Sequence, residues 1–180
     1  MVLNWGEKNG YTMDIKKFSL GKTVPRSRVF NAKELDMILN KCKDESFQRF
    51  VQLAYYTGAR RGEINELKDF MIDDGRLQVS GKTGERFIKL NKQAEDVLSK
   101  QNVLWKYGLN YITKNFKKNC RRLGVRNARF HDLRRTFGLN LIKSGMPIFQ
   151  VSKLLGHASV NTTEQHYAPL LINDIEDFTI

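Results

Sequence analysis

Hydrophobic residues recur along most of this chain at helical spacing, about three or four positions apart. The first such segment begins at Asn31-Ala-Lys-Glu34, where an N-cap side chain is followed by a glutamate at the third helical position. The pattern continues with Leu35, Ile38, Leu39 and Cys42, which fall on one face of a helix. The sequence therefore predicts a helix that starts at residue 31 and buries this face.

The same periodicity, together with helix-end signals, predicts helices in much of the remaining chain. A helix over residues 45–56 ends at Thr57-Gly58, and a short helical turn follows over residues 60–67. Asn91 is placed to cap a helix that runs through Ser99. Further helices are expected at residues 110–123, 131–144 and 147–155. Inward positions on the helix over residues 45–56 are expected at Phe47, Phe50, Val51 and Ala54.

The middle of the chain changes to the two-residue period of strands. Phe70-Met-Ile72 is a short strand candidate, and residues 76–80 and 86–90 alternate between apolar and polar side chains. The connections, Asp73-Asp-Gly75 and Gly81-Lys-Thr-Gly84, have the composition of hairpin turns. The expected fold class is therefore mainly α with a small three-stranded antiparallel sheet, an α+β arrangement.

The periodicity also suggests where the domain begins and ends. Residues 1–30 show a helix-stop signal at Asn9-Gly10 and then little periodicity, which predicts the end of a preceding helix and a linker. Residues 31–169 form the predicted domain, and residues 170–180 form a predicted tail helix. That tail carries apolar residues on one face and acidic residues between them. We expect the chain to be part of a longer protein.

Charge narrows the choice of partner. The chain of 180 residues carries 31 Lys and Arg against 19 Asp and Glu, a net charge of +12, which favours a polyanion or an anionic surface. A hydrophobic content of 41% excludes a disordered basic tail, and no apolar run approaches the roughly 20 residues of a membrane span. The start of the chain does not have the pattern of a signal peptide. Cys42 and Cys120 match no metal or redox spacing and are expected to be free thiols in a reducing cytosol.

Chemistry-bearing residues gather between positions 131 and 167. His131 and Arg134 are three positions apart and share a helix face, where an imidazole beside a guanidinium suits a phosphate oxyanion. Leu-Leu-Gly-His157 follows the next predicted helix, and Tyr167 comes ten residues later in Thr-Thr-Glu-Gln-His-Tyr. Tyrosine is among the side chains that form covalent intermediates.

Together with two earlier motifs, these residues resemble the catalytic domain of the tyrosine recombinases, the phage-integrase family. The earlier motifs are Thr57-Gly-Ala-Arg60-Arg-Gly-Glu63 and Lys82 at the tip of the second predicted hairpin. The order Arg, Lys, His-x-x-Arg, His, Tyr is that of the family, and the resemblance covers roughly residues 30–170. It implies the integrase catalytic-domain fold and an active site made of Arg60, Lys82, His131, Arg134, His157 and Tyr167.

Two features depart from the family pattern. Many members place the tyrosine nine residues after the second histidine, where this chain has His166, with Tyr167 as the tenth. The spelling His-Tyr-Ala-Pro is familiar in integrase-like members, so Tyr167 is the expected nucleophile. The second departure concerns the start of the chain: the family's separate core-binding domain is expected to precede residue 1. Glu63, by contrast, matches a family position that supports the first arginine.

The implied activity is a site-specific recombinase or integrase that cleaves and rejoins DNA through a covalent 3′-phosphotyrosine. Arg60 and Arg134 would hold the phosphate oxygens, while His131 accepts the proton of Tyr167. Lys82 would protonate the leaving 5′ oxygen, and His157 would either bind a phosphate oxygen or pack behind the nucleophile. No metal, ATP or other cofactor is expected, because arginines supply the positive charge and the phosphotyrosyl link conserves the bond energy.

Double-stranded DNA is the expected partner, with self-association into a tetrameric synapse for the full-length protein and with no membrane. The predicted location is the cytoplasm, at the nucleoid when DNA is bound. The tail is expected either to fold back on its own domain or to dock on a neighbouring protomer. Backbone contacts to DNA are predicted for Lys114, Lys117, Lys118, Arg121, Arg122 and Arg135.

Other interpretations remain open at the level of sequence. The chain could be a DNA-binding module that has lost catalysis, or a DNA-relaxing enzyme similar to type IB topoisomerases. Each site residue taken alone is also an ordinary surface or packing residue. A zinc site at His131, His157 and His166 is weaker, because no two of them share ligand spacing. Phage integration, transposition and chromosome-dimer resolution are all compatible with the sequence.

Overall fold

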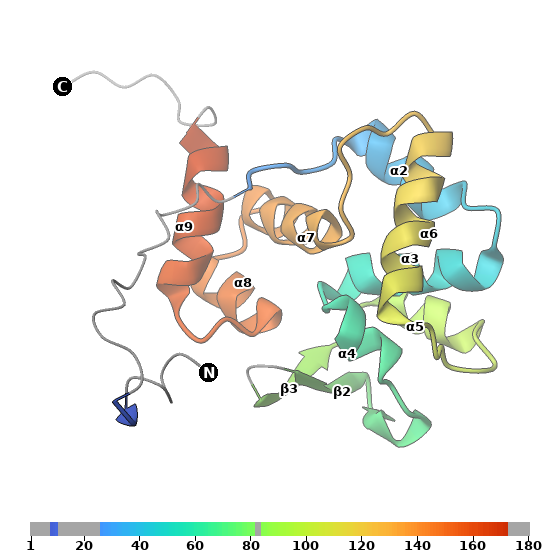
Figure 1. Ribbon diagram of the computed structural model, residues 1–180, viewed down its shortest axis with the longest axis horizontal. Helices are drawn as coiled ribbons and strands as arrows, with labels where there is room; N and C mark the ends of the chain where they lie inside the picture. Colours follow the sequence, from blue (N-terminus) through green and yellow to red (C-terminus); the bar gives the residue numbers. More distant parts are fainter. Residues whose placement is uncertain (1–7, 11–25, 82–83, 173–180) are drawn as a thin grey trace.

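Helix α3 (Glu45–Thr57) lies at the centre of the fold and packs against four other helices: α2 (Ala32–Asn40), α4 (Arg61–Asn65), α5 (Lys92–Ser99) and α7 (His131–Lys143). Its predicted inward residues, Phe47, Phe50, Val51 and Ala54, are all buried, which confirms the inward face that the periodicity predicted. The structure is a computed structural model that describes residues 8–10, 26–81 and 84–172. Figure 1 shows α3 in the interior, with α6 (Leu109–Arg122) crossing beside it.

Helix ends follow the local signals in the sequence. Asn31 and Glu34 form the reciprocal bonds of a capping box at the start of α2, as predicted. Gly58 ends α3 in the left-handed conformation, with φ of 62°. A β-carbon at Gly58 would lie 2.6 Å from the ring of Phe137 on α7, so this close approach of α3 and α7 also requires glycine.

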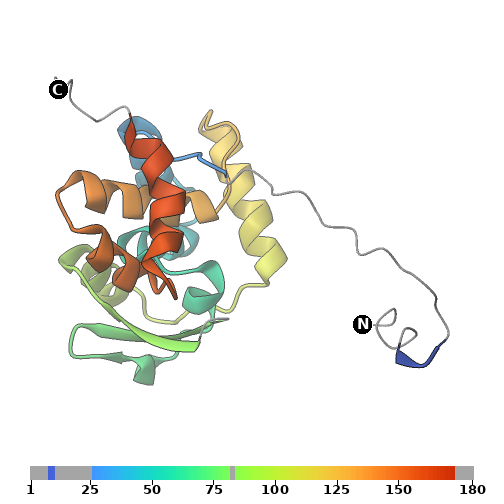
Figure 2. The ribbon, with the colours of Figure 1, turned by 90° about the vertical axis from the view of Figure 1, so that its left-hand side faces the viewer.

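Three antiparallel strands form a sheet in the order β1 (Ile72–Asp73), β2 (Arg76–Gly81) and β3 (Gly84–Lys89). The sheet lies along one edge of the helical body, which is clearest in Figure 2. The predicted fold class is therefore confirmed. The strand predicted at residues 70–72 is largely wrong: Asp69–Met71 is a 3-10 turn and Phe70 is 74% exposed. Its ring packs under the Lys68 ammonium instead of entering the core.

Two groups of buried side chains lie on either side of α7. The larger one centres on α3 and includes the inner face of the sheet. The smaller one joins α7, α8 (Ile148–Leu155) and α9 (Val160–Leu171) through Leu139, Val151, Leu155 and Tyr167. The expected nucleophile is therefore part of a small hydrophobic core.

The segment that enters the fold packs more closely than the linker predicted for residues 1–30. Phe30 is buried in the larger core, and its backbone N–H donates to the Thr136 hydroxyl at 2.9 Å. Arg26 makes a bidentate ion pair with Asp132, at 2.9 and 2.8 Å. The predicted boundary after residue 30 therefore falls within packed structure.

The last helix differs from the predicted boundary at residue 170. Helix α9 runs through Pro169 and ends at Leu171, and Leu170 and Leu171 pack against the smaller core. Proline removes one backbone hydrogen bond from a helix, and here only two helical residues follow it. Residues 173–180, which hold most of the predicted tail helix, lie outside the described residues, as does most of residues 1–25.

Candidate active site

Arg60 is held at the start of α4 by a carboxylate three positions later. Its guanidinium donates to Glu63 Oε1 at 2.7 Å, and its backbone N–H donates to Glu63 Oε2 at 2.6 Å. Glu63 itself is only 4% exposed. Burial by itself would raise the pKa of Glu63, but the hydrogen bonds from Arg60 and the charge of Arg86 outweigh burial and lower it. Arg60 is thus fixed by an ionised glutamate, as the resemblance predicted for Glu63.

Arg134 is buried between three helices. It projects from α7 and is 4% exposed. One guanidinium nitrogen donates to the carbonyl of Gly58 at 2.7 Å, and the other donates to the carbonyl of Leu155. Burial, followed by the charges of Arg60 and Arg86, lowers the pKa of Arg134 to about 9. The side chain therefore stays cationic at neutral pH in a fixed position.

A groove of about 770 Å³ runs between α4, α6 and the start of α7. Ser80, near the end of β2, also lines it, so one end of the sheet reaches the groove. Positively charged and imidazole side chains dominate its polar lining, which suits an extended polyanion. These groups are Arg60, Arg61, Lys117, Arg129, His131 and Arg134. Neither Arg61, which lies within the motif that contains Arg60, nor Arg129 was predicted to be a site residue.

His131 is the first residue of α7 and lines this groove. It keeps an exposed edge, yet the protein packed around it and the nearby cations, first Arg134, then Arg135 and Arg60, lower its pKa to about 4. The imidazole is therefore neutral near pH 7 and has a free capacity to accept a proton.

His157 lies in the turn between α8 and α9. Its Nδ1 is 2.8 Å from the Thr163 hydroxyl, a hydrogen bond that ties the turn to the first part of α9. Burial lowers the pKa of His157 to about 4, helped by the charges of Arg134 and His166. Its ring centroid lies 6.4 Å from that of His166.

Tyr167 is 3% exposed and lies in the smaller core. It is not among the described residues that line the groove. Burial raises its pKa to about 12, although Arg134 and Arg135 act in the opposite direction. The phenolate is therefore disfavoured in this conformation, because the loss of hydration outweighs the charge of the nearby guanidiniums.

Lys82 lies outside the described residues, so its side chain has no described position. The flanking strands place the hairpin as predicted, with Gly81 paired to Gly84. Ser80, two residues before Lys82, lines the groove. The described end of β2 therefore lies at the edge of the groove that holds Arg60 and Arg134.

Similarity to known proteins agrees with this arrangement. A profile described as the phage integrase family matches residues 109–172. The chain is 27% identical over 189 residues to the tyrosine recombinase XerA of Saccharolobus solfataricus, covering 93% of this chain and 64% of that protein. Residues 109–172, which include His131, Arg134, His157 and Tyr167, therefore match the phage integrase family.

Solved structures share the fold. A crystal structure of XerA recombinase aligns over 87% of this chain and 68% of its own, with a TM-score of 0.70 and 19% identity. The catalytic domain of bacteriophage HP1 integrase aligns over 79% and 88%, with a TM-score of 0.68 and 17% identity. XerH recombinase bound to its difH substrate aligns over 93% and 59%, with a TM-score of 0.67 and 20% identity. The chain thus has the fold of integrase catalytic domains.

On this integrase fold, the basic residues predicted to touch DNA divide into two groups. Lys114, Lys117, Lys118, Arg121 and Arg122 are exposed on α6. Arg135 differs: it is 9% exposed, and its guanidinium is 3.1 Å from Asp132 Oδ1. Its assignment to the DNA-contacting set is therefore corrected, because its charge is engaged with a buried carboxylate.

The candidate site contains a part-buried arginine that the sequence prediction missed. Arg86, on β3, is ion-paired with Glu63 at 3.0 Å and donates to the carbonyl of Leu154 at 2.7 Å. The only signal in the sequence is the strand alternation, which puts Arg86 on the same face as the buried Ile88.

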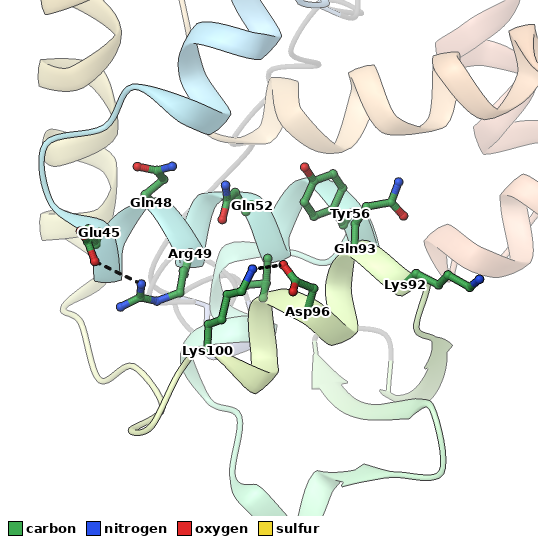
Figure 3. A pocket seen from close by; sticks show the side chains of 10 residues that line it. Glu45, Gln48, Arg49, Gln52, Tyr56, Lys92, Gln93, Asp96 and Lys100 are labelled. Atoms are coloured by element: carbon green, nitrogen blue, oxygen red, sulfur yellow. Dashed lines mark hydrogen bonds and ion pairs between the residues drawn. The ribbon is translucent and has the colours of Figure 1, made fainter.

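A second hollow, of about 680 Å³, lies between α3 and α5 (Figure 3). Two of its cations are paired along their own helices: Arg49 with Glu45 at 3.5 Å and Lys100 with Asp96 at 2.6 Å. It therefore lacks the converging cations of the groove that holds Arg60 and Arg134. In residues 8–10, 26–81 and 84–172 no three metal-ligating side chains converge, and no helix is both long and apolar enough to cross a membrane.

Proposed function

We propose that this chain is the catalytic part of a site-specific DNA recombinase or integrase, which cleaves and rejoins strands through a 3′-phosphotyrosine at Tyr167. The chain spans 64% of the length of its XerA relative, so the proposal concerns the reaction and leaves the target site open. The observation that carries it is the convergence of Arg60, Arg134 and a neutral His131 in one basic groove.

The two arginines would stabilise the transition state. When a hydroxyl attacks a phosphodiester, negative charge increases on the non-bridging oxygens. Arg60 and Arg134 are already fixed by Glu63 and by backbone carbonyls, so little reorganisation is needed when that charge develops. Both retain guanidinium N–H groups beyond those already bonded, and Arg provides a planar donor array for two oxygens.

Proton transfer would complete the step. The Tyr167 oxygen bonds to phosphorus, its proton passes to the neutral His131, and the bond from phosphorus to the 5′ oxygen breaks. Lys82 supplies a proton to that 5′ oxygen as it leaves. Religation reverses these transfers, so no external energy source is required. His157, bonded to Thr163, would hold the turn that leads into α9.

Tyr167 would have to leave its packed position before it attacks. Its burial and its pKa of about 12 are unsuited to forming phenolate in place. Moving α9 toward the groove would rehydrate the hydroxyl and bring it to Arg60 and Arg134. DNA binding is a suitable trigger, because phosphate in the groove would draw the cations and the tyrosine together.

Double-stranded DNA is the proposed substrate and the exposed face of α6 its backbone contact. The XerH relative in the comparison is bound to a difH substrate, which supports DNA as partner for this fold. We further propose that full-length protomers associate on DNA, with the acidic and apolar segment after residue 172 docking on a neighbour.

Covalent trapping tests the proposal directly. The chain would be mixed with a library of nicked duplexes of randomised sequence, whose cleaved fragment diffuses away and leaves the enzyme attached. The proposal predicts a DNA adduct on wild-type protein, located on Tyr167 by mass spectrometry, and loss of that adduct in Tyr167→Phe with little change in DNA affinity.

A matched tyrosine provides the control. Tyr111, on α6, is 46% exposed and outside the smaller core, so Tyr111→Phe should keep the adduct. An adduct on His166, or one that survives in Tyr167→Phe, contradicts the assignment. Sequencing the trapped DNA would reveal the target, and a supercoil-relaxation assay beside a two-site recombination assay would separate a recombinase from a topoisomerase-like enzyme.

A further inference from the structure

Arg86 connects the sheet to both ends of the proposed active site. It lies on β3, two positions after Gly84, and its side chain is 12% exposed. One guanidinium nitrogen donates to the Glu63 carboxylate on α4, and the other donates to the carbonyl of Leu154 in the last turn of α8. Within the described part of the chain, Arg86 is thus a direct bridge between α4 and α8.

The contact with Glu63 concerns Arg60. Glu63 Oε2 accepts from the Arg60 backbone at 2.6 Å and from Arg86 Nη2 at 3.0 Å, while Oε1 accepts from the Arg60 guanidinium. Arg86 therefore neutralises and orients a buried carboxylate whose other oxygen holds Arg60. Without Arg86, Glu63 would keep only its two bonds to Arg60 and would lose the cation that ties it to β3.

The contact with α8 concerns His157. The last carbonyls of a helix have no partner within the helix. In α8 the carbonyl of Leu154 accepts from Arg86 at 2.7 Å, and the next one, of Leu155, accepts from Arg134. The part-buried Arg86 from β3 and the buried Arg134 from α7 therefore fix the end of α8, from which the chain turns through Gly156 to His157.

Gly156 shows how close this packing is. A β-carbon there would lie 2.2 Å from Arg86 Cδ and 2.6 Å from Arg86 Nε. The backbone at Gly156 also has φ of 62°, in the left-handed region. Glycine is thus required both for the turn and for the passage of the arginine stem across it.

We propose that Arg86 is a positioning residue, which sets Arg60 and the Gly156-His157 turn at a fixed separation through simultaneous bonds to Glu63 and to the Leu154 carbonyl. This role rests on the proposed phosphotyrosine chemistry and adds a residue to it. Arg86 does not touch DNA in this role; it acts through Glu63 and the end of α8. Charge alone is insufficient, because a lysine ammonium cannot span two acceptors in the fixed geometry of a guanidinium.

Single-turnover adduct formation on the trapped nicked duplex would separate positioning from folding. The amplitude reports the fraction of competent enzyme, and the rate constant reports the geometry of the site. Arg86→Gln and Arg86→Lys should both reduce the rate constant by about 10- to 100-fold, with amplitude and DNA affinity close to wild type. Arg28→Ala is the matched control. Arg28 is a part-buried arginine whose guanidinium lies 2.6 Å from Glu34, and neither residue lines the groove. The rate constant of adduct formation should be unchanged in this variant.

Two results would overturn the proposal: a wild-type rate in Arg86→Lys, or a loss in Arg86→Gln confined to amplitude. Should Arg86→Gln fold poorly, Gly156→Ala displaces the arginine from the other side and should slow the reaction likewise. The double variant Gly156→Ala with Arg86→Gln should be no slower than the slower single variant, and additive losses contradict the shared mechanism.

A measurement without DNA distinguishes failure of this inference from failure of the proposed function. Nitrogen-15 NMR of the histidine rings in the free chain should show an altered His157 signal, and loss of its bond to Thr163, in Arg86→Gln but not in Arg28→Ala. Absence of any wild-type adduct refutes the proposed chemistry, whereas an unchanged His157 signal in Arg86→Gln refutes the positioning role.

Discussion

The hydroxyl of Tyr167 occupies the space that a side chain on Gly138 would need. A β-carbon at Gly138 would lie 2.2 Å from the Tyr167 oxygen and 2.6 Å from the ring carbon that bears it. Gly138 is in the interior of α7, four residues after Arg134. The close approach of α7 and α9 at this point therefore depends on a glycine, and it holds the proposed nucleophile beside the helix that carries Arg134.

Substituting Gly138 by Ala tests this packing. Alanine favours a helix interior over glycine by up to about 1 kcal/mol. Against this, forcing a methyl group into the Tyr167 ring costs about 1–3 kcal/mol, so Gly138→Ala should lower the free energy of unfolding. Urea unfolding is the measurement. Gly62→Ala is the control, since a β-carbon at Gly62 meets nothing within 4 Å, and it should not be destabilising. A Gly138→Ala protein at least as stable as wild type contradicts the described position of Tyr167.

A sulfur substitution in the substrate tests the division of roles between Lys82 and Arg134. A 5′-bridging sulfur needs little protonation to leave, so it removes the need for a general acid. Lys82→Ala should therefore regain adduct formation on the sulfur substrate, whereas Arg134→Ala should stay inactive on both. Equal defects of Lys82→Ala on the oxygen and sulfur substrates would eliminate its role as proton donor.

Salt dependence tests the basic face of α6. DNA affinity should fall steeply with salt in wild type, and the logarithmic slope should decrease by about 0.9 for each DNA phosphate that the protein no longer neutralises. Replacing Lys114, Lys117 and Lys118 by alanine should reduce that slope. Arg135→Gln provides the contrast, because Arg135 is paired with buried Asp132 and should affect stability while leaving the slope unchanged. An identical slope in the triple variant refutes the assignment of this face.

Acid sensitivity follows from the histidines. The pKa of His157 falls from its ordinary 6.5 to about 4 in the fold, and His131 shifts in the same direction. Between these values the unfolded chain binds the proton and the folded chain does not. The stability they confer is therefore fully present above pH 6.5 and is lost as the pH falls toward 4.

Urea midpoints at about pH 7 and about pH 5 would measure this loss. The midpoint should be lower at the acidic pH, and His157→Gln should shrink the difference by on the order of 1 kcal/mol once solvent screening is allowed for. Ionised carboxylates such as Glu63, whose pKa is lowered, titrate below this window and would not mimic the effect. Equal midpoints at the two pH values would show that His157 is not held neutral by the fold.

Local patterns in the sequence predicted most of the elements and the order of the motifs. Helix caps such as Asn31, and stops such as Gly58, depend on a few neighbouring residues, so they can be recognised without tertiary information. The predictions failed where distant residues decide the outcome. Phe70 is apolar by type but exposed in the fold, because the strand that it was expected to join is short and Lys68 covers its ring.

The sequence by itself determined the fold class and the candidates Arg60, His131, Arg134, His157 and Tyr167, because spacing and residue type carry that information. Only the tertiary structure decided how they are held. It placed Arg86 between Glu63 and α8, paired Arg135 with Asp132, and buried Tyr167 against Gly138. The reason is physical: hydration, charge pairing and close packing depend on side chains far apart in the sequence, whose meeting no local pattern reports.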